Sequence, residues 1–81
     1  MFNNKAQDGM KNVCGENIRK LRKAMPEKVS QRRFADMLCL YGLDVHKNVV
    51  SGIESRERFV TDIELKAIKE VLNVSYEELL N

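Results

Sequence analysis

The chain has 81 residues, of which 43% are hydrophobic and 32% charged, and its formal net charge is +2. A chain of this length builds one small hydrophobic core, so we expect a single domain. Its few aromatic residues argue against a stacking platform for single-stranded nucleic acid. No stretch approaches the roughly 18 apolar residues of a membrane span, and residues 1–10 lack the apolar core of a signal peptide. We therefore expect a cytoplasmic protein without a membrane partner.

The cysteines, Cys14 and Cys39, stand alone in the sequence, and His46 is the only histidine. Because a zinc site needs several such ligands at short spacings, we expect no metal and no other cofactor. We expect both thiols to be reduced, with Cys39 on a buried helix face. A disulfide has no support in the sequence.

Charge is distributed unevenly along the chain. Residues 1–33 hold nine Lys or Arg and three acids, residues 34–60 hold three and four, and residues 61–81 hold two and five. A positive segment suits contact with phosphates, but Lys and Arg are equally common on solvated helix faces. The charge pattern alone leaves both interpretations open.

The first 11 residues are polar and lack apolar periodicity, so we expect a flexible N-terminal arm over residues 1–11 and a folded domain over residues 12–81. From about Asn12 the sequence predicts a first helix, which Pro26 ends. The apolar residues of this helix recur at helical spacing: Val13, Ile18, Leu21 and Met25.

A second helix is predicted over residues 31–40. Ser30 suits its N-cap and Gly42 its end. Its apolar side chains recur every three or four residues and form the face that packs inward: Phe34, Ala35, Leu38 and Cys39.

A third helix follows a turn. Either Asp44 or His46 suits its N-cap, and the sequence does not choose between them. Val50 and Ile53, three residues apart, form the face that packs on the second helix, and the other face is polar. Two short helices at an angle, the second with a free polar face, indicate a helix-turn-helix.

Two further helices are indicated by paired capping residues. Thr61 with Glu64 and Ser75 with Glu78 form capping boxes, in which each side chain bonds the other residue's backbone N–H. The apolar residues that follow are expected to close the core: Ile63, Ala67, Ile68, Val71, Leu72, Val74, Leu79 and Leu80. The sequence thus predicts an all-α, compact domain of five short helices.

These segments, in this order, resemble the Cro and phage-repressor-like helix-turn-helix family, also called the XRE family, over about residues 17–80. The resemblance is carried by four segments: Ile18-Arg19-Lys20-Leu21-Arg22, Ser30-Gln31 to Ala35, Ser51-Gly52-Ile53-Glu54, and Glu64-Leu65 to Leu72-Asn73-Val74-Ser75-Tyr76-Glu77-Glu78-Leu79-Leu80. In the last of these, Asn73 replaces the family's glycine. The resemblance implies a lambda-repressor-like fold that binds double-stranded DNA sequence-specifically. It also implies a small transcriptional regulator, a repressor, that binds an operator as a homodimer with its third helix in the major groove.

The resemblance implies base contacts from the start of the third helix. Asn48 is the best candidate reader because its amide can donate to and accept from one adenine, and Lys47 can reach guanine or a phosphate. Val49 can touch a thymine methyl, and Ser51 can reach a base or a phosphate. Gly52 lacks the longer polar side chain that the family usually carries here, so we expect readout to rest on the first turn.

The resemblance also implies phosphate contacts and one structural ion pair. Gln31 corresponds to the family glutamine that bonds the DNA backbone. The further phosphate-binding candidates are Ser55, Arg56 and Arg58 after the third helix, with Arg32 and Arg33 on the second. Arg22 and Glu54 match a buried pair that holds the end of the third helix against the first.

The turn between the second and third helices departs from the family. It is about five residues longer than the family spacing, so either the second helix is extended or the turn is wide. Leu40, Tyr41 and Leu43 are apolar enough to pack beneath it, and the competing interpretation is a loop that shifts the docking angle of the third helix.

One alternative function remains open. An antitoxin or anti-regulator can use the same fold to bind a protein, through the acidic C-terminal third and a surface of Tyr76, Leu79 and Leu80. An enzyme is not expected, because the sequence contains no catalytic triad, paired carboxylates or phosphate-binding loop. We accordingly expect no small-molecule substrate.

Overall fold

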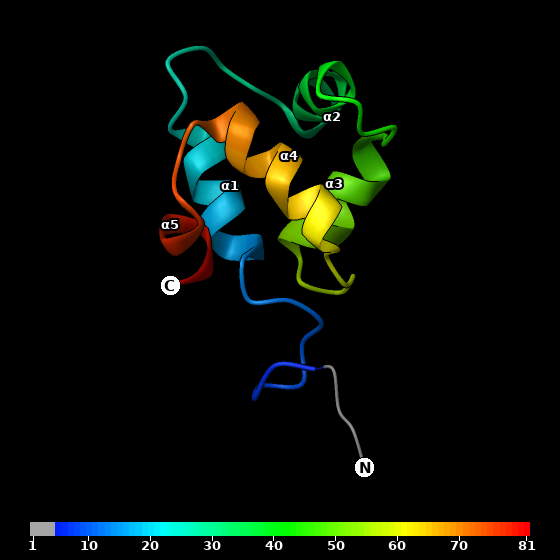
Figure 1. The fold of residues 1–81 in the computed structure, drawn as a ribbon, viewed down its shortest axis with the longest axis vertical. Coiled ribbons are helices and arrows are strands. Elements are labelled where there is room, and N and C mark those ends of the chain that lie inside the picture. The colour runs from blue at the N-terminus through cyan, green and yellow to red at the C-terminus, as the bar shows by residue number, and fades with distance from the viewer. Residues whose placement is uncertain (1–4) are drawn as a thin grey trace.

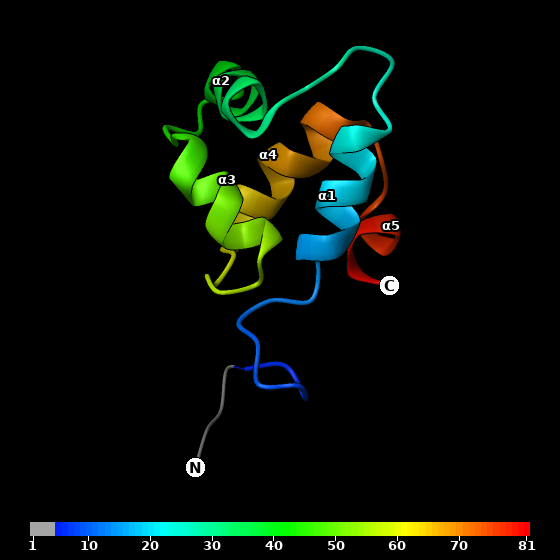
Figure 2. The same cartoon turned by 180° about the vertical axis from the view of Figure 1, so that it is seen from behind.

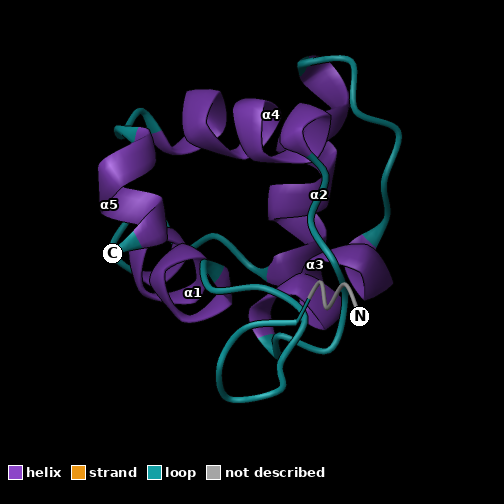
Figure 3. Cartoon of the chain, turned by 60° about the horizontal axis from the view of Figure 1, so that its bottom comes forward, coloured by secondary structure: helices purple, strands orange, loops and turns teal. Residues whose placement is uncertain are grey.

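The structure, a computed structural model, describes residues 5–81. In this part of the chain it contains α1 (Gly15–Lys23), α2 (Gln31–Leu40), α3 (Lys47–Glu54), α4 (Asp62–Leu72) and α5 (Tyr76–Leu80). These described residues contain helices and loops but no strand, which confirms the predicted all-α fold (Figure 3).

The helices form two groups, which are joined by α4 and by direct contact between α1 and α3. The first group is α1 and α5, which lie side by side, and the second is α2 and α3 (Figure 1). α4 lies in front of α3 in Figure 1 and behind it in Figure 2, and it contacts both α1 and α2. α4 therefore backs the helix pair and leaves the opposite side of α3 open.

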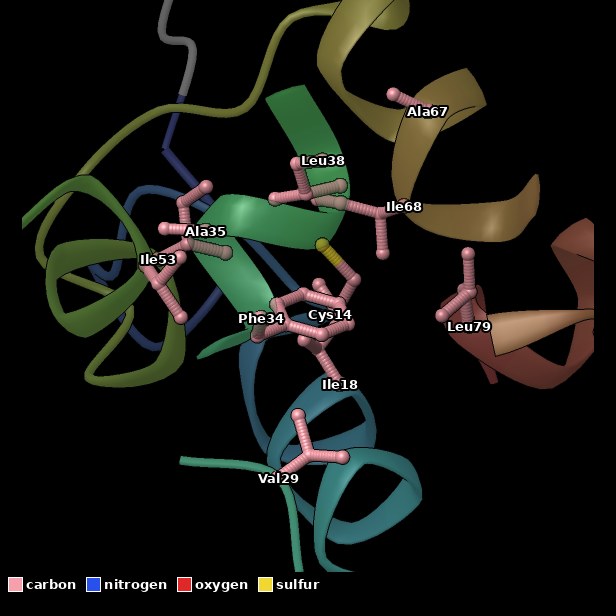
Figure 4. Packing of buried hydrophobic residues seen from close by; sticks show 11 residues of the cluster. Cys14, Ile18, Val29, Phe34, Ala35, Leu38, Ile53, Ala67, Ile68 and Leu79 are labelled. Atoms are coloured by element: carbon pink, nitrogen blue, oxygen red, sulfur yellow. The ribbon is translucent and has the colours of Figure 1, made fainter. Parts of the chain in front are cut away.

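Every helix contributes a fully buried side chain to one core (Figure 4). Phe34 lies near Cys14 and Ile18, and Leu38 points toward Ile68 of α4. The largest of these buried side chains are Phe34, Ile18, Leu38, Ile68, Leu79 and Val50, all predicted to face inward.

The predicted helix starts at Ser30, Thr61 and Ser75 are confirmed. Each hydroxyl accepts a hydrogen bond from the backbone N–H three residues later, at 3.0, 3.2 and 3.1 Å respectively. Both capping boxes are complete. His46 is the N-cap of α3, but its side chain makes no capping hydrogen bond.

Three helices end in the same way, through a residue in the left-handed conformation. These residues are Gly42 after α2, Arg56 after α3 and Asn73 after α4, with φ of 84°, 66° and 55°. In each case this residue and the next donate their backbone N–H groups to carbonyls of the last helical turn, at 3.0 to 3.3 Å. This is the Schellman arrangement, which favours glycine and tolerates asparagine at the left-handed position. It explains why Asn73 can replace the family's glycine.

The prediction that Cys39 lies on a buried face is wrong. Cys39 is exposed and Cys14 is buried, although both thiols are free. The first helix also begins at Gly15 and not at Asn12, because the Asn12 Oδ1 accepts from the Gly15 N–H at 2.9 Å and so lies ahead of the helix. This start turns Cys14 into the core and leaves Val13 51% exposed, contrary to its prediction as a core residue.

The predicted burial of Ile63 and Leu80 is also wrong, since they are 71% and 44% exposed. Ile63 lies in the first turn of α4, whose inward face is formed by Glu64, Ala67 and Ile68. An apolar residue beside that face stays in solvent because no other helix covers it.

The connection between α2 and α3 spans residues 41–46, so the turn is wide and α2 is not extended. Leu40 is 85% exposed and Tyr41 is 57% exposed, which contradicts their predicted packing beneath the turn. Of these three predicted residues only Leu43 packs against the core, because its N–H bonds the Leu38 carbonyl and draws it back over the end of α2.

The predicted flexible arm, residues 1–11, lies partly outside the described residues. Of the part that is described, Ala6, Gly9 and Met10 form a turn closed by backbone hydrogen bonds of 2.8 and 2.9 Å. Lys11 then donates its N–H to the Arg56 carbonyl at 3.0 Å. The flexibility of this segment stays a prediction.

Candidate nucleic-acid interface

α3 has one buried and one exposed face. Its buried residues are Val50, Ile53 and Glu54. The exposed face runs along the whole helix and into its C-cap, and consists of Lys47, Asn48, Ser51 and Ser55. Polar side chains at this helical spacing form a continuous stripe that a partner can approach.

Two of the predicted contact residues on α3 are half-buried. Val49 packs against the hydrophobic core. At Gly52, an added Cβ would lie 3.3 Å from the Cβ of Arg58, so a larger side chain would press on the loop after α3. A side chain at position 52 would therefore require Arg58 to shift by a few tenths of an ångström.

The first turns of α2 and α3 meet in a shallow hollow of about 300 Å³. Arg32, Lys47 and Asn48 line it together, as candidates for DNA contact from two helices. Asp36 and His46 line it too. Neither was among the predicted site residues. Asp36 could have been found because it lies one helical turn after Arg32, and His46 because it directly precedes Lys47.

The predicted pair of Arg22 and Glu54 is present and buried. Arg22 Nε lies 2.7 Å from Glu54 Oε2 and Nη2 lies 2.9 Å from Oε1, which is a bidentate geometry. The side chains are 8% and 3% exposed. The hydrogen bonds to Glu54 raise the pKa of Arg22. A third donor group of Arg22, Nη1, bonds the Val29 carbonyl at 2.7 Å.

Gln31 joins this cluster. Its Nε2 donates to Glu54 Oε1 at 3.1 Å, so the predicted phosphate-binding amide also braces the end of α3. Glu54 thus connects α3 to α1 through Arg22 and to the start of α2 through Gln31. The cluster therefore helps to fix the orientation of α3, together with the buried side chains of Val50 and Ile53.

Arg58, a predicted phosphate contact, is held by Glu64 at the start of α4. Its Nη1 and Nη2 donate to the Glu64 carboxylate at 2.9 and 2.8 Å. These bonds raise the pKa of Arg58 and lower that of Glu64, whose side chain is only 9% exposed. Because the Arg58 side chain is 38% exposed, one edge of it still faces solvent.

Arg56, the other predicted phosphate contact of this loop, is held by the N-terminal segment. Its Nη1 lies 2.7 Å from Asp8 Oδ2, and its Nε donates to the Asn12 carbonyl at 2.8 Å. The pKa of Asp8 is lowered by the Met10 backbone N–H and further by Arg56. Only 19% of the Arg56 side chain is exposed.

Asn12 links three segments and was missed as a functional residue in the sequence. Besides opening α1, its Nδ2 donates to the carbonyls of Ile53 and Arg58, at 3.1 and 2.8 Å. Its signal in the sequence was a capping-type residue shortly before a helix. Gly15 completes the contact, because an added Cβ would collide with the Ile53 carbonyl oxygen.

Comparison with protein families matches residues 18–79 to the family described as Helix-turn-helix. This family is one of DNA-binding regulators, and the match covers most of the chain. The protein therefore belongs to the helix-turn-helix family of the Cro and phage-repressor-like (XRE) type. No curated protein and no solved structure matches the chain.

Along residues 5–81, no helix is long and apolar enough to cross a membrane. Within the same residues no three His, Cys, Asp or Glu side chains are grouped so that they could hold a metal ion.

Proposed function

We propose that this protein is a sequence-specific transcriptional regulator that binds an operator with α3 in the major groove and represses by occupying it. The observation that carries the proposal is the polar stripe of α3, exposed along its length while Val50 and Glu54 fix the other face. An α-helix fits the major groove, where polar side chains distinguish all four base pairs.

In this proposal the first turn of α3 reads the sequence. Asn48 bonds an adenine in bidentate fashion and Lys47 contacts a guanine or a phosphate. Ser51 reaches a neighbouring base or phosphate, while the half-buried Val49 offers only its edge to a thymine methyl. Gly52 has no side chain and is half-buried beside Arg58, so it adds no base contact of its own.

Phosphate contacts on both sides of the groove would come from the exposed Arg32 and from four side chains that already have partners within the protein, Gln31, Ser55, Arg56 and Arg58. Arg32 and Gln31 would contact phosphates from the start of α2, where free backbone N–H groups also favour an anion. The phosphate contacts at the end of α3 would come from Ser55, Arg56 and Arg58. The last two are ion-paired within the protein, so DNA phosphates would share or replace their acidic partners.

The test is selection from random DNA duplexes at two salt concentrations. We expect enrichment of a two-fold-symmetric site, as a homodimer requires, with binding that weakens as salt rises. Asn48→Ala should lose about 1–3 kcal/mol and relax preference at one base pair, whereas Arg32→Ala should weaken binding to all sequences alike.

Absence of any enriched site would overturn the proposal. It would favour the alternative, a protein-interaction module. In that case the surface could include Tyr76 and Leu80, which are 41% and 44% exposed, but not the fully buried Leu79.

A further inference from the structure

Residues 5–11, the N-terminal segment, leave the domain at the end where α1 begins and α3 finishes (Figures 1 and 2). Both the side chain and the backbone of Arg56 hold this segment. Asp8 Oδ2 lies 2.7 Å from Arg56 Nη1, and the Lys11 N–H donates to the Arg56 carbonyl at 3.0 Å. Asp8 also accepts from the Met10 N–H at 3.0 Å. One carboxylate thus closes the turn of the segment and binds the cation at the end of α3.

Asp8 and a DNA phosphate would bind Arg56 through the same kind of bond, in which a guanidinium N–H donates to an anionic oxygen. The Arg56 Nε is already used by the Asn12 carbonyl at 2.8 Å, and Nη1 faces Asp8. The Arg56 side chain is 19% exposed, whereas that of Asp8 is 50% exposed. Because an ion pair at the surface contributes little net free energy, a phosphate can replace the carboxylate at small cost.

A hollow of about 460 Å³ beside Arg56 gives a phosphate room to reach it. Six polar or charged residues line this hollow: Glu16, Arg19, Lys20, Glu54, Ser55 and Arg56. Ser55 also belongs to the polar stripe of α3, so the hollow continues the surface that would face DNA. The charge of Glu54 is already balanced by Arg22. The three cations of the lining therefore outweigh Glu16, and the hollow favours an anion.

We propose that Asp8 occupies Arg56 in the free protein and that a DNA phosphate displaces it, which makes the N-terminal segment an autoinhibitory element. The proposal rests on the proposed function, since it requires a phosphate at Arg56. A phosphate contact carries no base information, so the segment lowers the affinity for every duplex alike. DNA binding in turn releases the segment from the end of α3.

The first test compares Asp8→Asn with Glu57→Gln in binding to one duplex of arbitrary sequence at fixed salt concentration. Both variants lose one negative charge, and asparagine keeps an oxygen that can accept from the Met10 N–H. Glu57 is exposed in the same loop as Arg56 and belongs to no ion pair formed among residues 5–81. We expect Asp8→Asn to tighten binding about two- to fivefold, and Glu57→Gln to have a smaller effect.

The same two changes made in an Arg56→Gly background isolate the contact. Without the guanidinium, Asp8 has no competitor to exclude, so Asp8→Asn should then change the affinity no more than Glu57→Gln does. Equal effects of the two changes in the wild type would overturn the proposal. So would an excess effect of Asp8→Asn that persists with Arg56→Gly. Absence of any duplex binding by the wild type would instead overturn the proposed function, and this proposal with it.

The second test observes the segment by NMR. Heteronuclear NOE values of the Gly9 and Met10 amides report backbone order on the picosecond to nanosecond timescale. In the free protein these N–H groups bond the Ala6 carbonyl at 2.9 Å and Asp8 at 3.0 Å. We expect both values to fall when the duplex saturates the protein, because the turn loses its anchor on Arg56. Unchanged values, or higher ones as a segment that itself bound DNA would give, would overturn the proposal.

Discussion

Arg56 has an unfavourable backbone conformation, but its side chain makes favourable contacts. Its φ of 66° lies in the left-handed region, which costs a residue with a Cβ roughly 1–2 kcal/mol relative to the right-handed region. A glycine would avoid that cost. The arginine side chain instead reaches Asp8 and the Asn12 carbonyl, so it ties the N-terminal segment to the end of α3.

Comparison of Arg56→Gly with Arg56→Ala separates these two effects. Both variants lose the side-chain contacts, but only glycine removes the backbone strain. We expect Arg56→Gly to be more stable than Arg56→Ala by about 1 kcal/mol in urea unfolding. Equal stabilities, or a more stable alanine variant, would show that the backbone at position 56 carries no strain.

At the scale of the helices, the orientation of α3 depends on Glu54. The carboxylate accepts hydrogen bonds from Arg22 and Gln31, in a site where its side chain is 3% exposed. Glu54→Ala leaves the buried Arg22 charge without its partner, and we expect it to lower the free energy of unfolding by about 3–5 kcal/mol. Thermal melting measures this loss.

The control for that variant is Glu57→Ala, which removes an exposed acid near the same helix end. Its midpoint should stay close to that of the wild type. If Glu54→Ala also left the midpoint unchanged, the ion pair would not support the fold, and any loss of DNA binding would need another cause.

Local chemistry explains which helix boundaries could be predicted. Ser30, Thr61 and Ser75 satisfy backbone N–H groups within three residues of themselves, so their role is fixed by sequence alone. The burial of Cys14 in place of Val13, and the exposure of Cys39 and Ile63, depend on how each helix is rotated against distant elements. No short segment contains that information.

The candidate site was predictable to a similar extent. The exposed polar residues of α3 and the partnership of Arg22 with Glu54 followed from spacing and family resemblance. The engagement of Arg56 by Asp8, and of Arg58 by Glu64, did not, because a surface arginine has the same sequence signal whether it is free or paired. Asn12 acts through contacts with residues more than 40 positions away.

For the whole molecule, stability should depend on acid pH through Glu64. Hydrogen bonds from Arg58 hold the pKa of Glu64 below its ordinary value of 4.5. As the pH falls, Glu64 is therefore protonated at a higher pH in the unfolded chain than in the folded protein. The stabilisation by ionised Glu64 is present above the ordinary pKa and is lost as the pH falls through the lowered one.

We expect Glu64→Gln to be less stable than the wild type at neutral pH, with a difference that shrinks as the pH falls below about 4.5. Melting midpoints across this range measure it. Glu27→Gln, a change at an exposed acid in the α1–α2 loop, should show no such convergence. A difference that stayed constant with pH would contradict the role given to the Glu64 charge.

The close approach at Gly15 constrains how this protein can vary. Because the Ile53 carbonyl occupies the space of any Cβ, every substitution there pushes α1 away from α3, whatever side chain it adds. The separation would also pull Arg22 from Glu54, so a substitution at position 15 acts on α3, which lies more than 30 residues further along the chain. Gly9 and Gly42 have open surroundings and restrict substitution only through their backbone conformation. In genetic terms, we expect position 15 to accept only glycine, and its mutants to share the phenotype of mutants that displace α3.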